Sequence, residues 1–70
     1  MSDSIYRVTE VIGTSTQSWE EATRTAVETA AKTLRDLRVG EVVKLDVTVE
    51  DGHIAQYRAR VNISFKYETD

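Results

Sequence analysis

The longest regular pattern in the chain is a strict alternation of apolar and polar residues near its C-terminal end. The run from Ile54 to Tyr67 has an apolar side chain at every second position and polar side chains between them. A period of two is typical of a β-strand with two different faces, and this run is more than twice the usual strand length. At ~3.3 Å per residue it reaches roughly 43 Å. One face needs an apolar cover, and the other, which includes Arg58, Arg60 and Lys66, must meet a polar environment.

The length of the chain limits how large a core it can build. Its 70 residues are expected to form one domain, residues 1–70, and a domain of this size buries only about 60% of the surface of its unfolded chain. A monomer of this kind would be marginally stable. We therefore expect the chain to associate with further copies of itself.

Composition and charge argue against several classes of protein. The sequence has no cysteine and one histidine, His53, so a disulfide framework, a thiolate metal site and a histidine cluster are not expected. The formal net charge of −3 argues against nonspecific binding to nucleic acid. No apolar run approaches the ~18 residues of a membrane span. The expected location is the cytoplasm, with neither nucleic acid nor a membrane as partner.

Residues that could carry out catalysis do not occur at a recognisable spacing. No nucleophile lies at a characteristic separation from a base, and His53 follows the expected turn at Asp51 and Gly52, where an exposed histidine is common. The acidic pair Glu20 and Glu21 fits the positive end of a helix better than a catalytic site. We expect a binding protein and not an enzyme.

The first half of the chain predicts one strand and one helix. Residues 5–12 are rich in apolar and β-branched side chains, and the segment 13–16 that follows is typical of a turn. Ser18 and Glu21 have the spacing of a capping box, with Ser18 as the N-cap. Apolar residues then recur at steps of three and four as far as Leu37. This pattern predicts a helix over residues 18–37, about 29 Å long.

The second half predicts a hairpin of two long strands. Residues 39–50 alternate between apolar and polar side chains, and Asp51 with Gly52 is a strong signal for a hairpin turn into the long third strand. The predicted architecture is an α+β fold in the order β-α-β-β, with a three-stranded antiparallel sheet wrapping one helix. Strands of ~40 Å overhang a helix of ~29 Å, so apolar groups near the strand ends are expected to be covered by other subunits.

This order of elements, together with three short motifs, makes the chain resemble the dodecin family. The motifs are Gly13-Thr14-Ser15, Gly40-Glu41-Val42-Val43 and Val61-Asn62-Ile63-Ser64-Phe65-Lys66. The resemblance implies a small cytoplasmic protein that assembles as a hollow homododecamer, with helices outside and sheet faces lining the cavity. It also implies binding and storage of a small-molecule ligand, which in the best known members is a flavin such as riboflavin or FMN.

The resemblance also implies a ligand-binding set, Val39, Gly40, Glu41 and Arg58. Flavin-binding dodecins have a stacking tryptophan where this chain has Val39, and a glutamine that binds the ring edge where it has Arg58. Because a valine covers far less of an aromatic ring, weak flavin binding or none is expected. The calcium dodecins resemble the chain more closely at Ser18-Trp19-Glu20, which makes calcium a possible ligand, although the sequence identifies no metal-binding residues.

Two sets of residues have alternative interpretations. Trp19 could stack on a ligand, but at the first position of a helix it more often packs against the sheet. Arg58 and Arg60 lie two residues apart on one face and could grip a phosphate or carboxylate. The alternative is a ladder of ion pairs with one of three carboxylates, Glu41, Asp46 or Glu50. On either interpretation the polar face of the third strand is the expected binding surface, or the surface of a shell that has lost its ligand.

Overall fold

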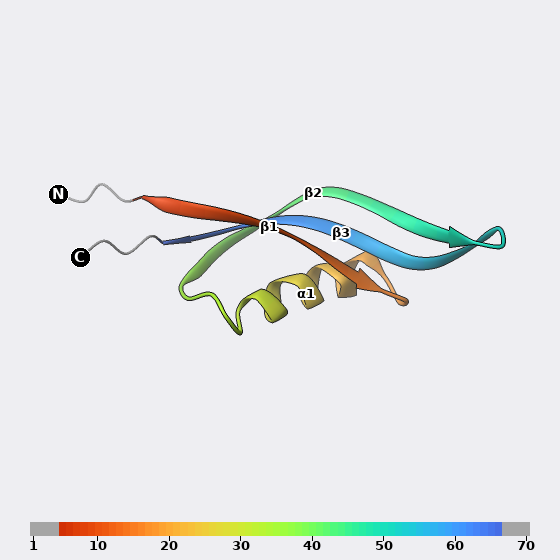
Figure 1. Ribbon diagram of the computed structural model, residues 1–70, viewed down its shortest axis with the longest axis horizontal. Coiled ribbons are helices and arrows are strands. Elements are labelled where there is room, and N and C mark those ends of the chain that lie inside the picture. Colours follow the sequence, from red (N-terminus) through yellow and green to blue (C-terminus); the bar gives the residue numbers. More distant parts are fainter. Residues whose placement is uncertain (1–4, 67–70) are drawn as a thin grey trace.

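The computed structural model describes residues 5–66, which form three strands and one helix (Figure 1). The elements are β1 (Tyr6–Ser15), α1 (Trp19–Ala30), β2 (Leu37–Glu50) and β3 (His53–Lys66). The strand order is β1-β3-β2, and β3 pairs antiparallel with both neighbours. The predicted α+β fold, with its β-α-β-β order and a three-stranded antiparallel sheet around one helix, is confirmed. Among the described residues, no helix is long and apolar enough to cross a membrane.

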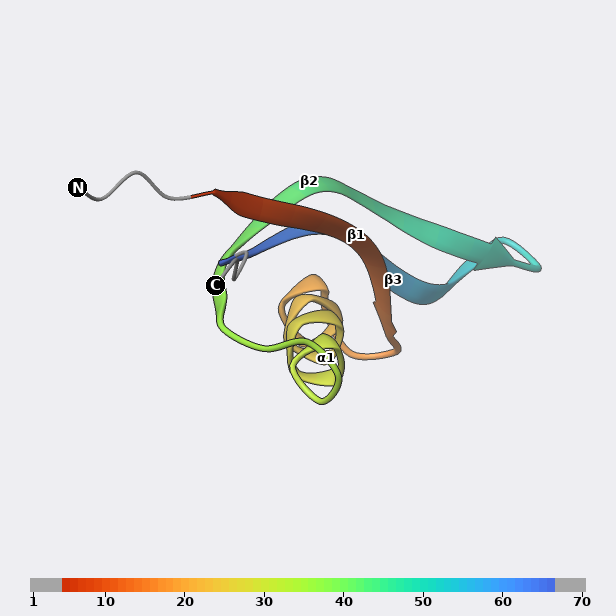
Figure 2. The same ribbon diagram turned by 60° about the vertical axis from the view of Figure 1, so that its left-hand side comes forward.

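The helix lies in the hollow of the curved sheet and covers one of its faces (Figure 2). Its buried side chains are alanines spaced four residues apart, and they meet alternate residues of β3. The buried core consists of Ala22, Ala26, Ala30, Ala59, Val61 and Ile63. The alternation in the sequence of β3 therefore predicted its helix-facing side correctly, since the buried residues of this strand are two apart.

The helix begins as its sequence predicts. Ser18 has an extended backbone, and its Oγ accepts a hydrogen bond from the backbone N–H of Glu21 at 3.0 Å. The other half of the capping box does not form. The backbone N–H of Ser18 donates to the Oγ of Ser15 at 3.5 Å instead, and the Glu21 carboxylate lies 3.6 Å from the guanidinium of Arg24. An N-cap of this kind typically contributes about 1 kcal/mol.

The helix ends earlier than predicted. The expected range, residues 18–37, is wrong at its C-terminal end: α1 stops at Ala30, and Leu37 is already the first residue of β2. Asp36 has a left-handed backbone with φ of 57°, which redirects the chain into the strand. Leu34 and Leu37 still pack on the core and so continue the apolar spacing, although neither is helical. Twelve helical residues cover only about 18 Å.

The strand boundaries also differ from those predicted. The first strand does not end before Gly13 but runs through it to Ser15, so the expected turn over residues 13–16 is wrong. Gly13 serves close approach instead, because the helix crosses the strand at this residue. The third strand is described as far as Lys66, and Tyr67 lies outside the described residues.

The hairpin between β2 and β3 has the predicted two-residue turn. Asp51 and Gly52 both have positive φ, 52° and 78°, as a type I′ turn requires, and Glu50 pairs directly with His53. The hairpin extends beyond the N-terminal end of α1 (Figure 1). The expected overhang of the strands past the helix is therefore present, and it is larger than predicted because the helix is shorter.

Candidate functional site

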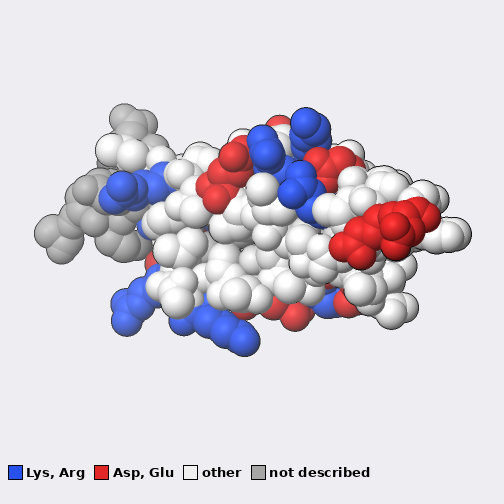
Figure 3. Space-filling view, turned by 45° about the vertical axis from the view of Figure 1, so that its right-hand side comes forward, with Lys and Arg blue, Asp and Glu red and all other residues white. Residues whose placement is uncertain are grey.

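The sheet face opposite α1, here called the open face, carries most of the predicted site residues. Since Ala59, Val61 and Ile63 point into the core, the residues that alternate with them on β3 point away from the helix. Across the strands β1, β3 and β2 the register places them in four rows, Val8–Ser64–Val39, Glu10–Asn62–Glu41, Ile12–Arg60–Lys44 and Thr14–Arg58–Asp46. Figure 3 shows basic and acidic side chains side by side along the sheet side of the molecule.

The open face is less polar than the third strand alone indicates. The edge strands contribute large aliphatic side chains to it, and Val8, Ile12 and Val39 are 61%, 47% and 59% exposed. Val8 and Val39 lie in the same row, on either side of Ser64. The face can therefore offer both apolar contact area and charged groups to a ligand.

Arg58 is held by Asp46 in the neighbouring strand. The guanidinium Nε donates to Oδ1 at 2.7 Å and an Nη2 hydrogen bond reaches Oδ2 at 2.9 Å, a bidentate arrangement. These hydrogen bonds lower the pKa of the Asp46 carboxyl below its ordinary value, and the charges of Arg58, Lys44 and Arg60 add to the effect. The same hydrogen bonds raise the pKa of Arg58. Of the three carboxylates considered from the sequence, Asp46 is the partner.

Trp19 packs against the sheet, as the more common interpretation of the sequence predicted. Its ring meets Tyr57 edge to face, with 5.2 Å between centroids and an angle of 76°, and its Nε1 donates to the backbone carbonyl of Asp46 at 2.9 Å. Asp46 thus joins the helix start to Arg58 on the open face, through its backbone on one side and its carboxylate on the other. The sequence named it only as one of three candidates.

A bulge explains why the sequence could not single out Asp46. Counting back from the two-residue turn places Leu45 opposite Arg58. The register shifts between Thr48 and Val49, where β3 contains one additional residue, and this shift moves Asp46 into the paired position.

The predicted binding residues Val39, Gly40, Glu41 and Arg58 do not form one cluster in a single chain. Val39 and Glu41 are exposed on the open face, but Gly40 faces the helix, where a Cβ would lie 3.4 Å from Val27. Val39 pairs with Ser64, six residues along β3 from Arg58, which corresponds to about 20 Å.

Metal ligands were not predicted from the sequence, and one row of the open face offers suitable oxygen atoms. Within residues 5–66 no three His, Cys, Asp or Glu side chains lie close enough together to hold a metal ion. The row Glu10–Asn62–Glu41 supplies two carboxylates and one amide. Such oxygen ligands suit calcium, which takes about 6–8 of them.

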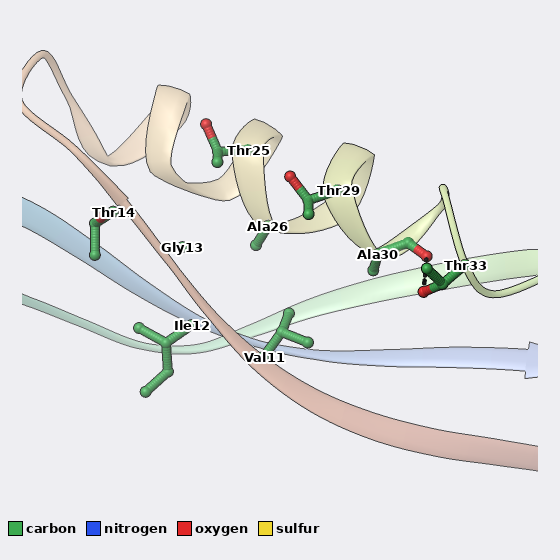
Figure 4. Close-up of a pocket in the computed structure, with 9 residues that line it drawn as sticks. All are labelled: Val11, Ile12, Gly13, Thr14, Thr25, Ala26, Thr29, Ala30 and Thr33. Carbon is green, nitrogen blue, oxygen red and sulfur yellow. Dashed lines mark hydrogen bonds between the residues drawn. The ribbon is translucent and has the colours of Figure 1, made fainter.

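A groove that the sequence did not predict runs between β1 and one flank of α1 (Figure 4). It has a volume of about 350 Å³. It is lined by aliphatic residues, glycine and threonines, namely Val11, Ile12, Gly13, Thr14, Thr25, Ala26, Thr29, Ala30 and Thr33. None of these nine residues is charged, so the groove suits another uncharged surface better than an ionic ligand.

Replacing Asp46 by asparagine is expected to lower the melting temperature at neutral pH but not at low pH. Because the pKa of Asp46 is lowered in the folded protein, its ionised form adds stability above the pKa of the unfolded chain, and this contribution is lost as the pH falls through the folded value. The gap between wild type and Asp46→Asn should be largest above about pH 5 and close below about pH 3. Circular dichroism melts across this range measure the gap, with the helix variant Glu28→Gln as baseline. A gap that persists at low pH would contradict this role of the ion pair.

Comparison with known proteins agrees with this fold. The family model described as Dodecin matches residues 5–68. The calcium dodecin of Mycobacterium tuberculosis is 40% identical over 63 residues, which cover 90% of this chain and 89% of that protein. The dodecin of Thermus thermophilus is 31% identical over 64 residues, covering 91% and 93%.

Solved structures give the same result. The structure of dodecin from Streptomyces coelicolor superposes with a TM-score of 0.92 at 40% identity, and the match covers the whole of both chains. The crystal structure of the calcium dodecin from Mycobacterium tuberculosis, described as having a novel calcium-binding site, has a TM-score of 0.82 at 40% identity and 96% coverage of both chains. The chain belongs to the dodecin family.

Proposed function

We propose that twelve copies of this chain form a hollow shell in the cytoplasm, which binds and sequesters a small ligand on the open face of its sheets. The observation that carries this proposal is the composition of that face: large exposed aliphatic side chains lie beside charged ones, and no described element covers them. A face of this kind is stabilised when other copies enclose it and a ligand fills it.

The ligand site requires two copies of the chain. Val39 and Arg58 are about 20 Å apart along β3, so a small ligand that contacts both must draw them from different subunits. Both edges of the sheet and the uncharged groove beside β1 are available for contacts between copies. Assembly and ligand binding are therefore linked in this proposal.

Flavin is a weak ligand of this member. Val39 supplies no aromatic platform, and the Nε–Nη2 edge of the Arg58 guanidinium is already engaged by Asp46. Binding the edge of a flavin ring through these two donors would require this bidentate pair to open, and a guanidinium offers the ring no hydrogen-bond acceptor. The ligand that the shell sequesters is accordingly an ion or a charged metabolite rather than a flavin.

Calcium is the second candidate ligand, and the row Glu10–Asn62–Glu41 favours it. A relative with 40% identity is a calcium dodecin. The row offers fewer oxygen ligands than the ~6–8 that calcium takes, so waters or a second copy would complete the coordination. Isothermal titration of chelator-treated protein with calcium tests this candidate, with Glu41→Gln as the variant that should weaken binding.

Light scattering at micromolar protein is expected to give a mass near twelve times the 7.9 kDa of one chain. The physical reason is the overhang of 14-residue strands past a 12-residue helix, which leaves aliphatic side chains for other copies to cover. The absorption spectrum of the same natively purified sample should lack the yellow flavin bands. A stable monomer or dimer would overturn the proposed shell, whereas a yellow dodecamer would overturn only the choice of ligand.

A further inference from the structure

Two cations face each other directly across the open face. Lys44 on β2 and Arg60 on β3 are register partners, so their Cβ atoms are separated by about 5 Å. Like charges in directly opposed positions destabilise a sheet. Neither side chain has an ion-pair partner among residues 5–66. The repulsion between the two cations therefore lowers the stability of the folded chain unless a negative group comes between the two side chains.

A β-bulge creates this juxtaposition. The register of β2 and β3 shifts between Val42 and Lys44, so that Val43 is an additional residue without a partner. With regular pairing Val43 would lie opposite Arg60, and Lys44 would point toward the helix opposite Ala59. The bulge interrupts the regular pairing of β2 with β3, and as a result Lys44 lies on the open face. Bulges that re-aim a side chain in this way are frequent beside functional sites.

The carboxylates near the pair leave room for an external anion. Asp46 lies close enough for Lys44 and Arg60 to lower its pKa, but its two oxygens are taken by Arg58. Glu41 lies in the adjacent row, at the ~7–8 Å of a diagonal neighbour. The carboxylate of Glu41 is thus a competitor for the cations that has not formed an ion pair with either of them.

We propose that Lys44 and Arg60 form a binding site for a phosphate group on the open face. The guanidinium of Arg60 offers paired N–H donors that match two phosphate oxygens, while the ammonium of Lys44 adds a compact charge from the opposite strand. Ile12, which pairs with Arg60 from β1, supplies an aliphatic wall on the other side. This site names the class of charged ligand that the proposed shell takes, and it rests on the open face being the binding face, not on the number of subunits.

Inorganic phosphate and the terminal phosphate of a larger metabolite supply the same chemistry. The probes are therefore sodium phosphate, ribose 5-phosphate with ribose as its uncharged counterpart, and sodium chloride at equal ionic strength. We expect both phosphates to raise the melting temperature of the wild type by several degrees more than chloride, and ribose to have no effect. A larger shift with ribose 5-phosphate than with phosphate would assign the site to a phosphorylated metabolite, and equal shifts would assign it to the phosphate group alone.

Variants distinguish phosphate binding at Lys44 and Arg60 from nonspecific screening of charges by salt. Lys44→Gln combined with Arg60→Gln should weaken phosphate binding at least tenfold in isothermal titration, while Arg24→Gln with Lys32→Gln, which removes the same charge from the helix side, should leave it within twofold of wild type. In chloride alone Lys44→Gln should melt above the wild type, because it removes the opposed like charge. Equal phosphate responses in the sheet variant and the wild type would overturn the site.

A third variant keeps the test decisive if the double variant folds poorly. Glu41→Gln removes the competing carboxylate and should tighten phosphate binding at least threefold, and the absence of any gain would count against the site. The mass of each variant, measured by light scattering on the same samples, reports separately on the shell. A dodecamer that ignores phosphate would overturn this inference and leave the assembly intact.

Discussion

Replacing Gly13 by alanine is expected to unfold the protein or to leave it without a cooperative melt at room temperature. A Cβ at this position would collide with the backbone carbonyl oxygen of Ala22 and lie 2.9 Å from the Cβ of Ala26. A backbone atom cannot move aside as the end of a flexible side chain can, so the whole helix would have to shift. Overpacking typically costs about 1–3 kcal/mol and occasionally more, and a collision with backbone belongs at the upper end of this range, which is a large share of the stability of a small domain.

Gly40→Ala provides the matched control for this prediction. It adds the same methyl group to the same face of the sheet, but there the nearest atoms are side-chain carbons of Val27 and Val61 at 3.4 and 3.5 Å, which is close to ordinary contact. This variant should keep its melting temperature within a few degrees of wild type. Circular dichroism gives the melting temperature of each variant. A Gly13→Ala protein as stable as Gly40→Ala would contradict the close crossing of the helix over β1 at Gly13.

The double change Val39→Trp with Arg58→Gln is expected to give the protein flavin binding that the wild type lacks. An indole at residue 39 supplies a stacking surface, and an uncharged amide at residue 58 can both donate and accept at the polar edge of the ring. The substitution at residue 58 also ends the bidentate pair with Asp46, so the side chain at this position is no longer held by that carboxylate. Riboflavin fluorescence should be strongly quenched at micromolar concentrations by the double variant and nearly unquenched by the wild type.

The single variants show how the two positions share the effect. Val39→Trp should recover more quenching than Arg58→Gln, because stacking supplies contact area while the amide mainly orients the ring. Since the two positions lie about 20 Å apart in one chain, quenching should also be lost under conditions that dissociate the assembly. Tight flavin binding by the unmodified protein would refute the role of these positions and point to Trp19 or Tyr57 as the platform.

The sequence predicted the parts of the fold that depend on local periodicity. The strand β3 alternates so regularly that its buried side could be identified residue by residue, and Asp51 with Gly52 determines a turn that few other dipeptides adopt. The end of the helix was not predictable in this way. Leu34 and Leu37 pack on the same core whether the chain is helical or not, so their spacing could not reveal the left-handed residue Asp36 between them.

The candidate site depends on features that have no local signal. Two of the three register shifts of β2 against β3, at Thr48/Val49 and at Val42/Lys44, decide that Asp46 meets Arg58 and that Lys44 meets Arg60. Neither of these two shifts is marked by glycine or proline in the sequence. Gly13 carried a signal that was interpreted incorrectly, because a glycine that ends a strand and a glycine that admits a helix look alike in sequence. Trp19 was assigned correctly to packing, but its hydrogen bond to the backbone of Asp46 depends on the same register.

The alternation of β3 has a consequence for how this protein can change over evolutionary time. The residues that hold the helix, Ala59, Val61 and Ile63, and the charged residues of the open face, Arg58 and Arg60, are interleaved along one strand and point to opposite sides of the sheet. A substitution in the second set changes the open face and leaves the buried side chains of β3 in place. The insertion or deletion of one residue would exchange the two sets unless a bulge, such as the one at Val43, absorbs it. New ligand preferences can therefore arise in this chain through point substitutions, whereas a change in strand length also requires a compensating bulge.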